Sequence, residues 1–372
     1  MDRNEYYGDE EAALTLQELD QWVQQVNDAS RLGSSSFSKA HILQPNTRKP
    51  EELSFSRAYS LSLSPLIIYC SSPILPLLVS SQVYRQVEFL AVGSWWILDE
   101  SGTKDASPSS SSDGCSLSKI PSGREDVFSD DTVSLKHKRA LMKFLKFIQS
   151  YEAQRSLWKA YDTRPLPEFL SSEYFELPDS LQKQLFATSL SALPMQETET
   201  GWAIEMIARH LRSIGIFSAG IGSVVPKWGG MGEICQVACR ACAVGGGTYV
   251  LKKGISDVEV ANDSEHMGYK KLNVRLDGGE TVETQYLSRS NKIKGGGNYM
   301  EAHHSISIIN SSLHHLFPSF GEDEPTPAVA MVVIPTGLGG GAEHHPPVYI
   351  QVHSSETGEC PQGQCRSIQS FS

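Results

Sequence analysis

Three cysteines in this chain have the residue type and the spacing of metal-cluster ligands. They are Cys235, Cys239 and Cys242, in a Cys-x3-Cys-x2-Cys pattern. Thiolates are soft ligands that hold iron–sulfur clusters, so this spacing could place three ligands around one cluster. The same residues fall within an apolar helical pattern, where a free cysteine is an ordinary small hydrophobic residue. We therefore expect the cysteines to pack as part of a helix, with a metal cluster as the alternative.

Two histidine pairs and a glycine-rich loop are the other candidates for chemistry. The pairs at 303–304 and 344–345 would each offer one metal ligand at best, because neighbouring residues of a strand point to opposite faces. Residues 230–235 read Gly-x-Gly-x-x-Cys, a dinucleotide-binding loop without its third glycine, and Pro226 interrupts the strand that should lead into it. We expect surface histidines and a packing loop. The sequence contains no Ser/His/Asp arrangement and no phosphate loop of the G-x-x-x-x-G-K type.

The composition indicates a globular chain with an acidic balance. Its 372 residues suffice for two domains, with 40% hydrophobic and 20% charged residues. A net charge of −11 argues against nucleic-acid binding, which needs a basic surface, and suits partners with basic patches. The seven cysteines are odd in number and no signal peptide begins the sequence, so we expect reduced thiols and a cytoplasmic protein. Residues 59–80 are apolar but contain three prolines and six serines, which favours two short buried segments over a membrane span.

Residues 225–254 are the stretch around which the rest of the chain is organised. A loop with three glycines leads into an apolar helix, glycines 245–247 end that helix, and residues 248–251 read as a buried strand. The helix carries two ionisable residues, Glu233 and Arg240, seven positions apart and so two turns along one face. Because both charges stand on an otherwise apolar helix, we favour a binding role for them, with a local structural role in anchoring their surroundings as the alternative.

Helix and strand patterns divide the chain into three parts. Residues 1–130 mix helix and strand and contain a Ser-rich insertion at 101–117. Residues 131–217 read as several short helices with wide apolar stripes, and residues 218–372 are mostly β. We predict a small helical domain inserted into a larger mixed domain. The expected elements are a helix at 14–26, a strand over 84–92, helices capped by Ser134 and starting near Asp179, a helix closed by Gly215, strands at 272–276, 328–334 and 348–353, a hairpin turn at 277–279, and no regular element after 366.

Five segments of the chain form an ordered set: residues 2–8, 84–89, 138–145, 232–240 and 246–249. Taken together and in this order, they resemble motifs of the Rab GDP-dissociation inhibitor and escort protein family. Three further features resemble the fungal escort members: the Ser-rich insertion, residues 122–128, and residues 353–364. No single segment would be specific, but the set covers most of the chain.

The resemblance implies an α/β fold (α+β mixed) of two domains. The larger one would be a FAD/NAD(P)-binding-like sheet domain similar to that of flavin monooxygenases, with the flavin lost and no other cofactor. The smaller one would be the inserted all-helical domain. The resemblance further implies that the family's first strand and glycine-rich turn are missing before Met1 and that the C-terminus is incomplete.

The same resemblance implies a non-catalytic accessory protein. It would bind GDP-loaded Rab GTPases, prenylated and unprenylated, and present them to the Rab geranylgeranyl transferase heterodimer. It would then shield the prenyl groups and deliver Rab in transient contact with membranes. Two alternatives stay open: a recycling inhibitor that does not support prenylation, and an iron–sulfur radical enzyme that uses S-adenosylmethionine and the three cysteines. Against the enzyme, Ala241 stands where that motif usually has an aromatic residue.

The family's functional residues carry over to three sets of positions. Leu166 stands where animal escort proteins place a phenylalanine that docks on the transferase. The apolar stripes of 131–217 would supply a prenyl groove, since each buried methylene contributes about 0.8 kcal/mol; the alternative is that they only pack on each other. The Rab-binding platform carries over to Tyr7, Tyr84, Glu88, Glu233, Arg240, Thr248 and Val250, where relatives carry methionine at the last position. The prenyl-groove candidates are Leu141, Phe144, Ile148, Leu185, Ile207 and Leu211.

Overall fold

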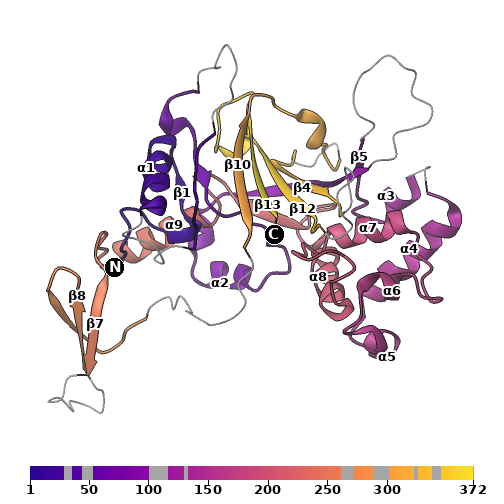
Figure 1. Cartoon of the computed structure of the whole chain (residues 1–372), viewed down its shortest axis with the longest axis horizontal. Helices are drawn as coiled ribbons and strands as arrows, with labels where there is room; N and C mark the ends of the chain where they lie inside the picture. Colours follow the sequence, from indigo (N-terminus) through magenta and orange to yellow (C-terminus); the bar gives the residue numbers. More distant parts are fainter. Residues whose placement is uncertain are drawn as a thin grey trace.

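An eight-stranded sheet forms the centre of this computed structural model (Figure 1). The structure describes residues 1–28, 36–43, 53–99, 116–129, 133–260, 271–288, 301–321, 326–336 and 345–371. Most of the Ser-rich insertion predicted at 101–117 and the glycine-rich segment 337–341 lie outside these residues, as does the first histidine of the 344–345 pair.

Strands β4 and β11 are parallel neighbours in the middle of the large sheet. The apolar side chains of β11 from Val329 to Val333 are buried, as expected for a strand covered on both faces. The sheet order is β10-β13-β12-β11-β4-β6-β3, with β5 also paired to β4. Its strands are β3 (Ile68–Tyr69), β4 (Phe89–Asp99), β5 (Ser116–Lys119), β6 (Ser223–Pro226), β10 (His303–Ile309), β11 (Val329–Ile334), β12 (Val348–Ser354) and β13 (Cys365–Phe371).

Two smaller sheets complete the β structure. β1 (Ala13–Leu14) pairs with β2 (Leu61–Ser62). The strands β7 (Ile255–Val260), β8 (Leu272–Leu276) and β9 (Thr281–Thr284) form an antiparallel sheet that projects from the body at the lower left of Figure 1. The predicted hairpin turn at 277–279 joins β8 to β9, and Gly279 adopts the left-handed conformation, φ 86°, that the turn requires.

Six helices between residues 124 and 213 enclose a core of their own beside the large sheet (Figure 1). Four phenylalanines meet in it, with ring-centroid distances of 5.2 to 6.0 Å between contacting pairs of Phe144, Phe147, Phe169 and Phe175. Ser134 caps α4 as predicted, since its side chain accepts a hydrogen bond from the His137 amide. These helices are α3 (Arg124–Ser129), α4 (Leu135–Ile148), α5 (Arg155–Trp158), α6 (Leu166–Leu170), α7 (Asp179–Ala187) and α8 (Thr200–Ser213).

Three further α-helices lie on the other side of the sheet's middle strands in Figure 1. The predicted helix at 14–26 is α1, whose start is fixed by a capping box between Thr15 and Glu18. The helices are α1 (Leu16–Asn27), α2 (Ile74–Ser80) and α9 (Met231–Val244). Among the described residues, the single-turn 3-10 helices are η1 (Asp9–Glu11), η3 (Ser56–Ala58), η4 (Val83–Gln86), η5 (Lys159–Tyr161), η6 (His314–Leu316) and η8 (Ser355–Thr357).

The strand predicted over 84–92 is wrong in its first half. Gln82 turns the chain with a left-handed φ of 59°, and η4 follows in place of a strand. Val83 and Val87 both pack into the cluster that includes α9, whereas Arg85 between them is exposed, which fits a helical rather than an alternating pattern. The strand β4 then begins at Phe89 and continues to Asp99.

Two other expectations about strands are also wrong. Residues 248–251 are not a buried strand: Tyr249 is 39% exposed and the segment belongs to none of the named strands. The C-terminal residues, for which no element was predicted, form β13 between β10 and β12. Its residues from Cys365 to Ile368 are all buried although Arg366 and Ser367 are polar, so the sequence shows neither an alternating nor an apolar strand pattern.

Candidate protein-interaction surface

The helix α9 is the element around which the predicted platform residues gather. Its start lies against β1: a Cβ on Gly232 would stand 3.0 Å from the amide nitrogen of Ala13, and one on Gly229 would stand 2.6 Å from the Ala13 Cβ. At its other end, a Cβ on Gly247 would stand 2.6 Å from the sulfur of Cys242. These glycines therefore allow close packing, which agrees with the interpretation of the segment as a packing loop.

Glu233 and Arg240 lie on a stripe of α9 between its two packed faces. Ile234 and Val237 face the cluster shared with η4, and Gly232 faces the N-terminal segment on the opposite side. Burial raises the pKa of the half-buried Glu233, whereas Arg240 is exposed. Neither side chain forms an ion pair with another residue in the described part of the chain. Both charges are therefore available to a partner.

Tyr84 and Glu88 lie beside α9 because η4 packs on it. Val83 and Val87 contact the same cluster as α9, so the residues that follow each of them face outward. Tyr84 is 42% exposed. Glu88 pairs with Lys227, with 3.0 Å between the carboxylate oxygen and the ammonium nitrogen.

Tyr7, Thr248 and Val250 come together at the far end of α9. The amide of Asp2 donates to the carbonyl of Val250 at 2.9 Å, which ties the N-terminal segment to residues 248–253. The rings of Tyr7 and Tyr249 meet edge to face with 5.9 Å between centroids. The segment expected to be a buried strand is thus an exposed strip held against the N-terminus.

The three cysteines of α9 are not core residues, which corrects the sequence interpretation. Cys235 and Cys239 are half-buried and Cys242 is exposed. A hydrogen bond with the Cys242 thiol, together with burial and the neighbouring thiol Cys239, raises the pKa of Tyr249 to about 12. Among the described residues, no three His, Cys, Asp or Glu side chains are placed to hold a metal ion. The Cys239 and Cys242 thiols lie beside Tyr7 and Tyr249 instead.

The prenyl-groove candidates lie inside the helical core. Phe144, Ile148 and Ile207 are completely buried, Leu141 and Leu185 nearly so, and Leu211 is partly buried. A prenyl chain could therefore contact them only if the helices separated. Leu166, the docking candidate for the transferase, also has no exposed surface. A docking role for it would require α6 to open.

A buried ionic cluster was missed by the sequence analysis. Glu359 contacts Arg366 at 2.7 Å and His353 at 2.5 Å, and each of the three side chains is less than 7% exposed. Burial raises the pKa of the Glu359 carboxyl, but His353 and Arg366 outweigh this effect and bring the pKa to about 2. The three residues stand on β12, on β13 and in the loop between them, and the sequence carries no spacing signal that would join them.

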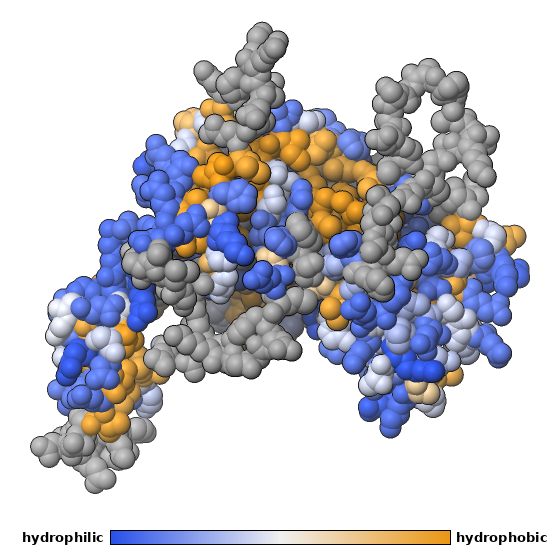
Figure 2. Space-filling view, in the orientation of Figure 1, coloured by the Kyte–Doolittle hydropathy of each residue, from blue (hydrophilic) through white to orange (hydrophobic). Residues whose placement is uncertain are grey.

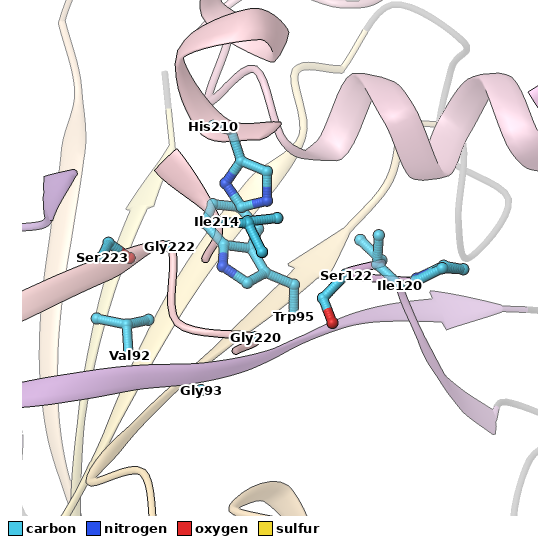
Figure 3. A pocket seen from close by; sticks show the side chains of 11 residues that line it. Val92, Gly93, Trp95, Ile120, Ser122, His210, Ile214, Gly220, Gly222 and Ser223 are labelled. Atoms are coloured by element: carbon cyan, nitrogen blue, oxygen red, sulfur yellow. The ribbon is translucent and has the colours of Figure 1, made fainter. Parts of the chain in front are cut away.

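A small cavity lies where α8 meets the large sheet (Figure 3). Its volume is about 20 Å³, enough for one water molecule. His210 is buried there at 4.6 Å from the Trp95 ring, and its Nδ1 has no hydrogen-bond partner in the described part of the chain. Burial lowers the pKa of His210 to about 4, so the ring is neutral at neutral pH. The cavity is too small for a cofactor or a prenyl group.

The projecting sheet exposes apolar side chains, which Figure 2 shows at its lower left. Val258, Val260 and Val282 are 36%, 51% and 39% exposed, and Tyr286 just beyond β9 is 72% exposed. Gathered apolar surface of this kind is typical of interaction sites. No helix within the described residues is long and apolar enough to span a membrane.

Comparisons with known proteins match most of this chain to one protein family. Residues 1–315 match a family model described as GDP dissociation inhibitor. A Saccharomyces cerevisiae protein named "Rab proteins geranylgeranyltransferase component A" is 30% identical over 254 residues, which cover 68% of this chain and 38% of that protein. Its Candida albicans namesake is 27% identical over 372 residues, covering 98% of this chain and 53% of that protein. The chain thus spans about half or less of the length of these two relatives.

A solved structure shares the fold. The crystal structure of a Rab GDI from Plasmodium falciparum covers 99% of this chain, and the match includes 75% of that protein. The TM-score is 0.64 and the sequence identity is 19%. At this identity the likeness shows the fold alone, and it confirms the mixed α/β class expected from the sequence.

Proposed function

This chain belongs to the GDP dissociation inhibitor family, and from that premise we propose that it acts as a Rab escort protein. It would bind GDP-loaded Rab GTPases, present them to Rab geranylgeranyl transferase, shield the attached prenyl groups and deliver Rab to membranes. In this role it has no active site of its own and works in the cytoplasm. The names of its relatives, component A of the transferase in two fungi, favour an escort over a recycling inhibitor.

The observation that carries the proposal is the convergence of the platform residues around α9. They come from three regions that are distant in sequence: the N-terminus, the η4 segment, and α9 with the strip directly after it. Glu233 and Arg240 present unpaired charges between these segments. Charged groups that are fixed on a packed helix are suited to fit complementary charges on a folded partner.

The prenyl-binding part of the proposal rests on the helical segment. We propose that residues 131–217 act as a separate domain whose helices part to admit the prenyl chain between the candidate residues. Support comes from the hydrophobic core that these helices form among themselves. Leu166 would reach the transferase only in such an opened state, because it is completely buried here.

The platform is tested by replacing Glu233 and Arg240 together with alanine. We expect the affinity for a GDP-loaded, unprenylated Rab GTPase, measured by calorimetry, to fall at least about tenfold. The matched control replaces Glu205 and Arg209, an exposed pair on α8 with 3.5 Å between its charges, and should bind Rab as the unchanged protein does. Equal affinity of the two double variants would show that the platform is elsewhere.

The escort function is tested separately by a prenylation assay. Purified Rab geranylgeranyl transferase, geranylgeranyl diphosphate and a Rab GTPase are incubated with and without this chain. An escort protein makes geranylgeranylation of Rab depend on its presence. Binding of GDP-loaded Rab without any support of prenylation would instead identify a recycling inhibitor.

A further inference from the structure

Trp228 combines an unusual backbone conformation with an exposed side chain. Its φ is 77°, in the left-handed region that bulky residues rarely adopt, and its side chain is 51% exposed. It stands in the loop between β6 and α9, directly before Gly229. A strained conformation persists only where surrounding contacts hold it, and such positions are frequent at functional sites.

The contacts that hold Trp228 come from two separate loops. Its amide donates to the carbonyl of Thr357 at 2.9 Å, and its own carbonyl accepts a hydrogen bond from the Ser60 hydroxyl. Its ring lies on Gly358, where an added Cβ would stand 2.3 Å from a ring carbon. The indole is therefore fixed on one side by a position that only glycine can occupy.

The loop beneath the ring is itself anchored in the core. Gly358 precedes Glu359, the centre of the buried ionic cluster. The backbone carbonyl of Glu359 also accepts a hydrogen bond from the Ser60 amide at 3.0 Å. Thr357 is completely buried. The loop that supports Trp228 is therefore rigid. The exposed face of the indole contributes no packing to the fold.

Trp228 also adjoins the predicted platform. The Lys227 ammonium lies 5.0 Å from the centre of the indole ring and pairs with Glu88 at 3.0 Å. On its other side the chain enters α9 within three residues, and Glu233 stands in the first turn. The exposed face of the indole is therefore continuous with the charged residues at the start of the platform.

We propose that Trp228 is an anchor residue of the Rab-binding surface, where its fixed indole packs against apolar side chains of the GDP-bound GTPase. This inference rests on the proposed function. Tryptophan is enriched among the residues that dominate binding energy in protein interfaces. A side chain that is already held in place loses little conformational freedom on binding, so more of its contact energy appears as affinity.

The choice of substitutions separates a direct contact of the indole with Rab from a role of Trp228 in stabilising the fold. Trp228→Gly removes the indole and also relieves the backbone strain, whereas Trp228→Phe keeps an aromatic ring. The control is Trp202→Ala, which removes a 42% exposed tryptophan from α8, away from the platform. Affinity for a GDP-loaded, unprenylated Rab GTPase is measured by calorimetry and Tm by differential scanning fluorimetry.

We expect Trp228→Gly to bind Rab at least about tenfold more weakly with an unchanged or higher Tm, and Trp228→Phe and Trp202→Ala to bind within about threefold of the unchanged protein. Unchanged affinity of Trp228→Gly would overturn the inference and leave the proposed function intact.

A lower affinity that accompanies a lower Tm is resolved by a second variant, Gly358→Ala, which displaces the ring without removing it. If that variant binds Rab normally, the inference also fails. No binding by the unchanged chain would refute the proposed function itself.

Discussion

Glu359 and Arg366 form an ion pair inside the protein, with 2.7 Å between Oε1 and Nη1 and at most 1% of either side chain exposed. The other carboxylate oxygen faces His353, and the Glu359 backbone carbonyl holds the Ser60 amide. Through these contacts Glu359 connects the strands β12 and β13 to Ser60, whose hydroxyl donates to the carbonyl of Trp228. A buried charge has no water to stabilise it, so the pair depends on its geometry.

Replacement of Arg366 by leucine should strongly destabilise the protein. It would leave the Glu359 carboxylate buried without its guanidinium partner, which costs about 3–5 kcal/mol in comparable sites. Urea unfolding followed by circular dichroism measures the change. Lys183→Ala is the control, because it removes an exposed pair with Asp179 and should leave the unfolding midpoint unchanged. A similar midpoint for both variants would contradict the assigned role of the buried pair.

Stability should fall in acid because of His210. Its pKa in the folded protein, about 4, is below the ordinary value of 6.5, so the unfolded chain takes up a proton that the folded chain refuses. Above pH 6.5 the ring is neutral in the folded and the unfolded chain, and His210 costs no stability. As the pH falls from 6.5 toward 4, only the unfolded chain binds the proton, so the free energy of unfolding decreases. The full loss is on the order of 3 kcal/mol.

His210→Phe should flatten this part of the pH profile of the free energy of unfolding. Phenylalanine suits the aromatic contacts with Trp95 and Tyr69, and it has no group that titrates. The control is His314→Gln, which removes an exposed histidine and should keep the slope of the unchanged protein. The same slope in His210→Phe as in the unchanged protein would rule out His210 as its source.

Gly232→Ala should move α9 away from β1. The new methyl group would stand 3.0 Å from both the Ala13 amide nitrogen and the Glu11 carbonyl oxygen, and backbone cannot yield as a flexible side chain can. We expect a destabilisation of about 1–3 kcal/mol and weaker Rab binding, measured by urea unfolding and calorimetry. Gly123→Ala, which has open space around it, is the matched control. Normal stability and binding of Gly232→Ala would show that this contact does not position α9.

Phe144→Ala tests whether the helical core is closed in the absence of a prenyl chain. The ring has no exposed surface and packs on Phe147 and Phe175, so its removal should cost about 3–5 kcal/mol in urea unfolding. Leu157→Ala, at an exposed position of α5, serves for comparison and should change little. A loss below about 1 kcal/mol for Phe144→Ala would instead indicate an open groove.

Helices with strong apolar periodicity could be predicted from the sequence because their signals are local. The helices at α1, α4, α7, α8 and α9 follow from stripes, caps and glycine stops that lie within one element. The residues after Gly247 could not be assigned in the same way. An apolar run such as 248–251 fits a buried strand. In the structure it is held at the surface by hydrogen bonds to the N-terminal segment, which is more than 240 residues away in sequence.

In the candidate site, too, some residues could be found from local sequence and others only from the tertiary structure. The sequence alone singled out Glu233 and Arg240, because two charges on one face of an apolar helix are visible in the spacing. Only the tertiary structure revealed that Trp228 is held in a left-handed conformation and that Glu359, His353 and Arg366 meet beneath its loop. Those relationships depend on how distant strands and loops approach one another, and local spacing carries no information about such approaches.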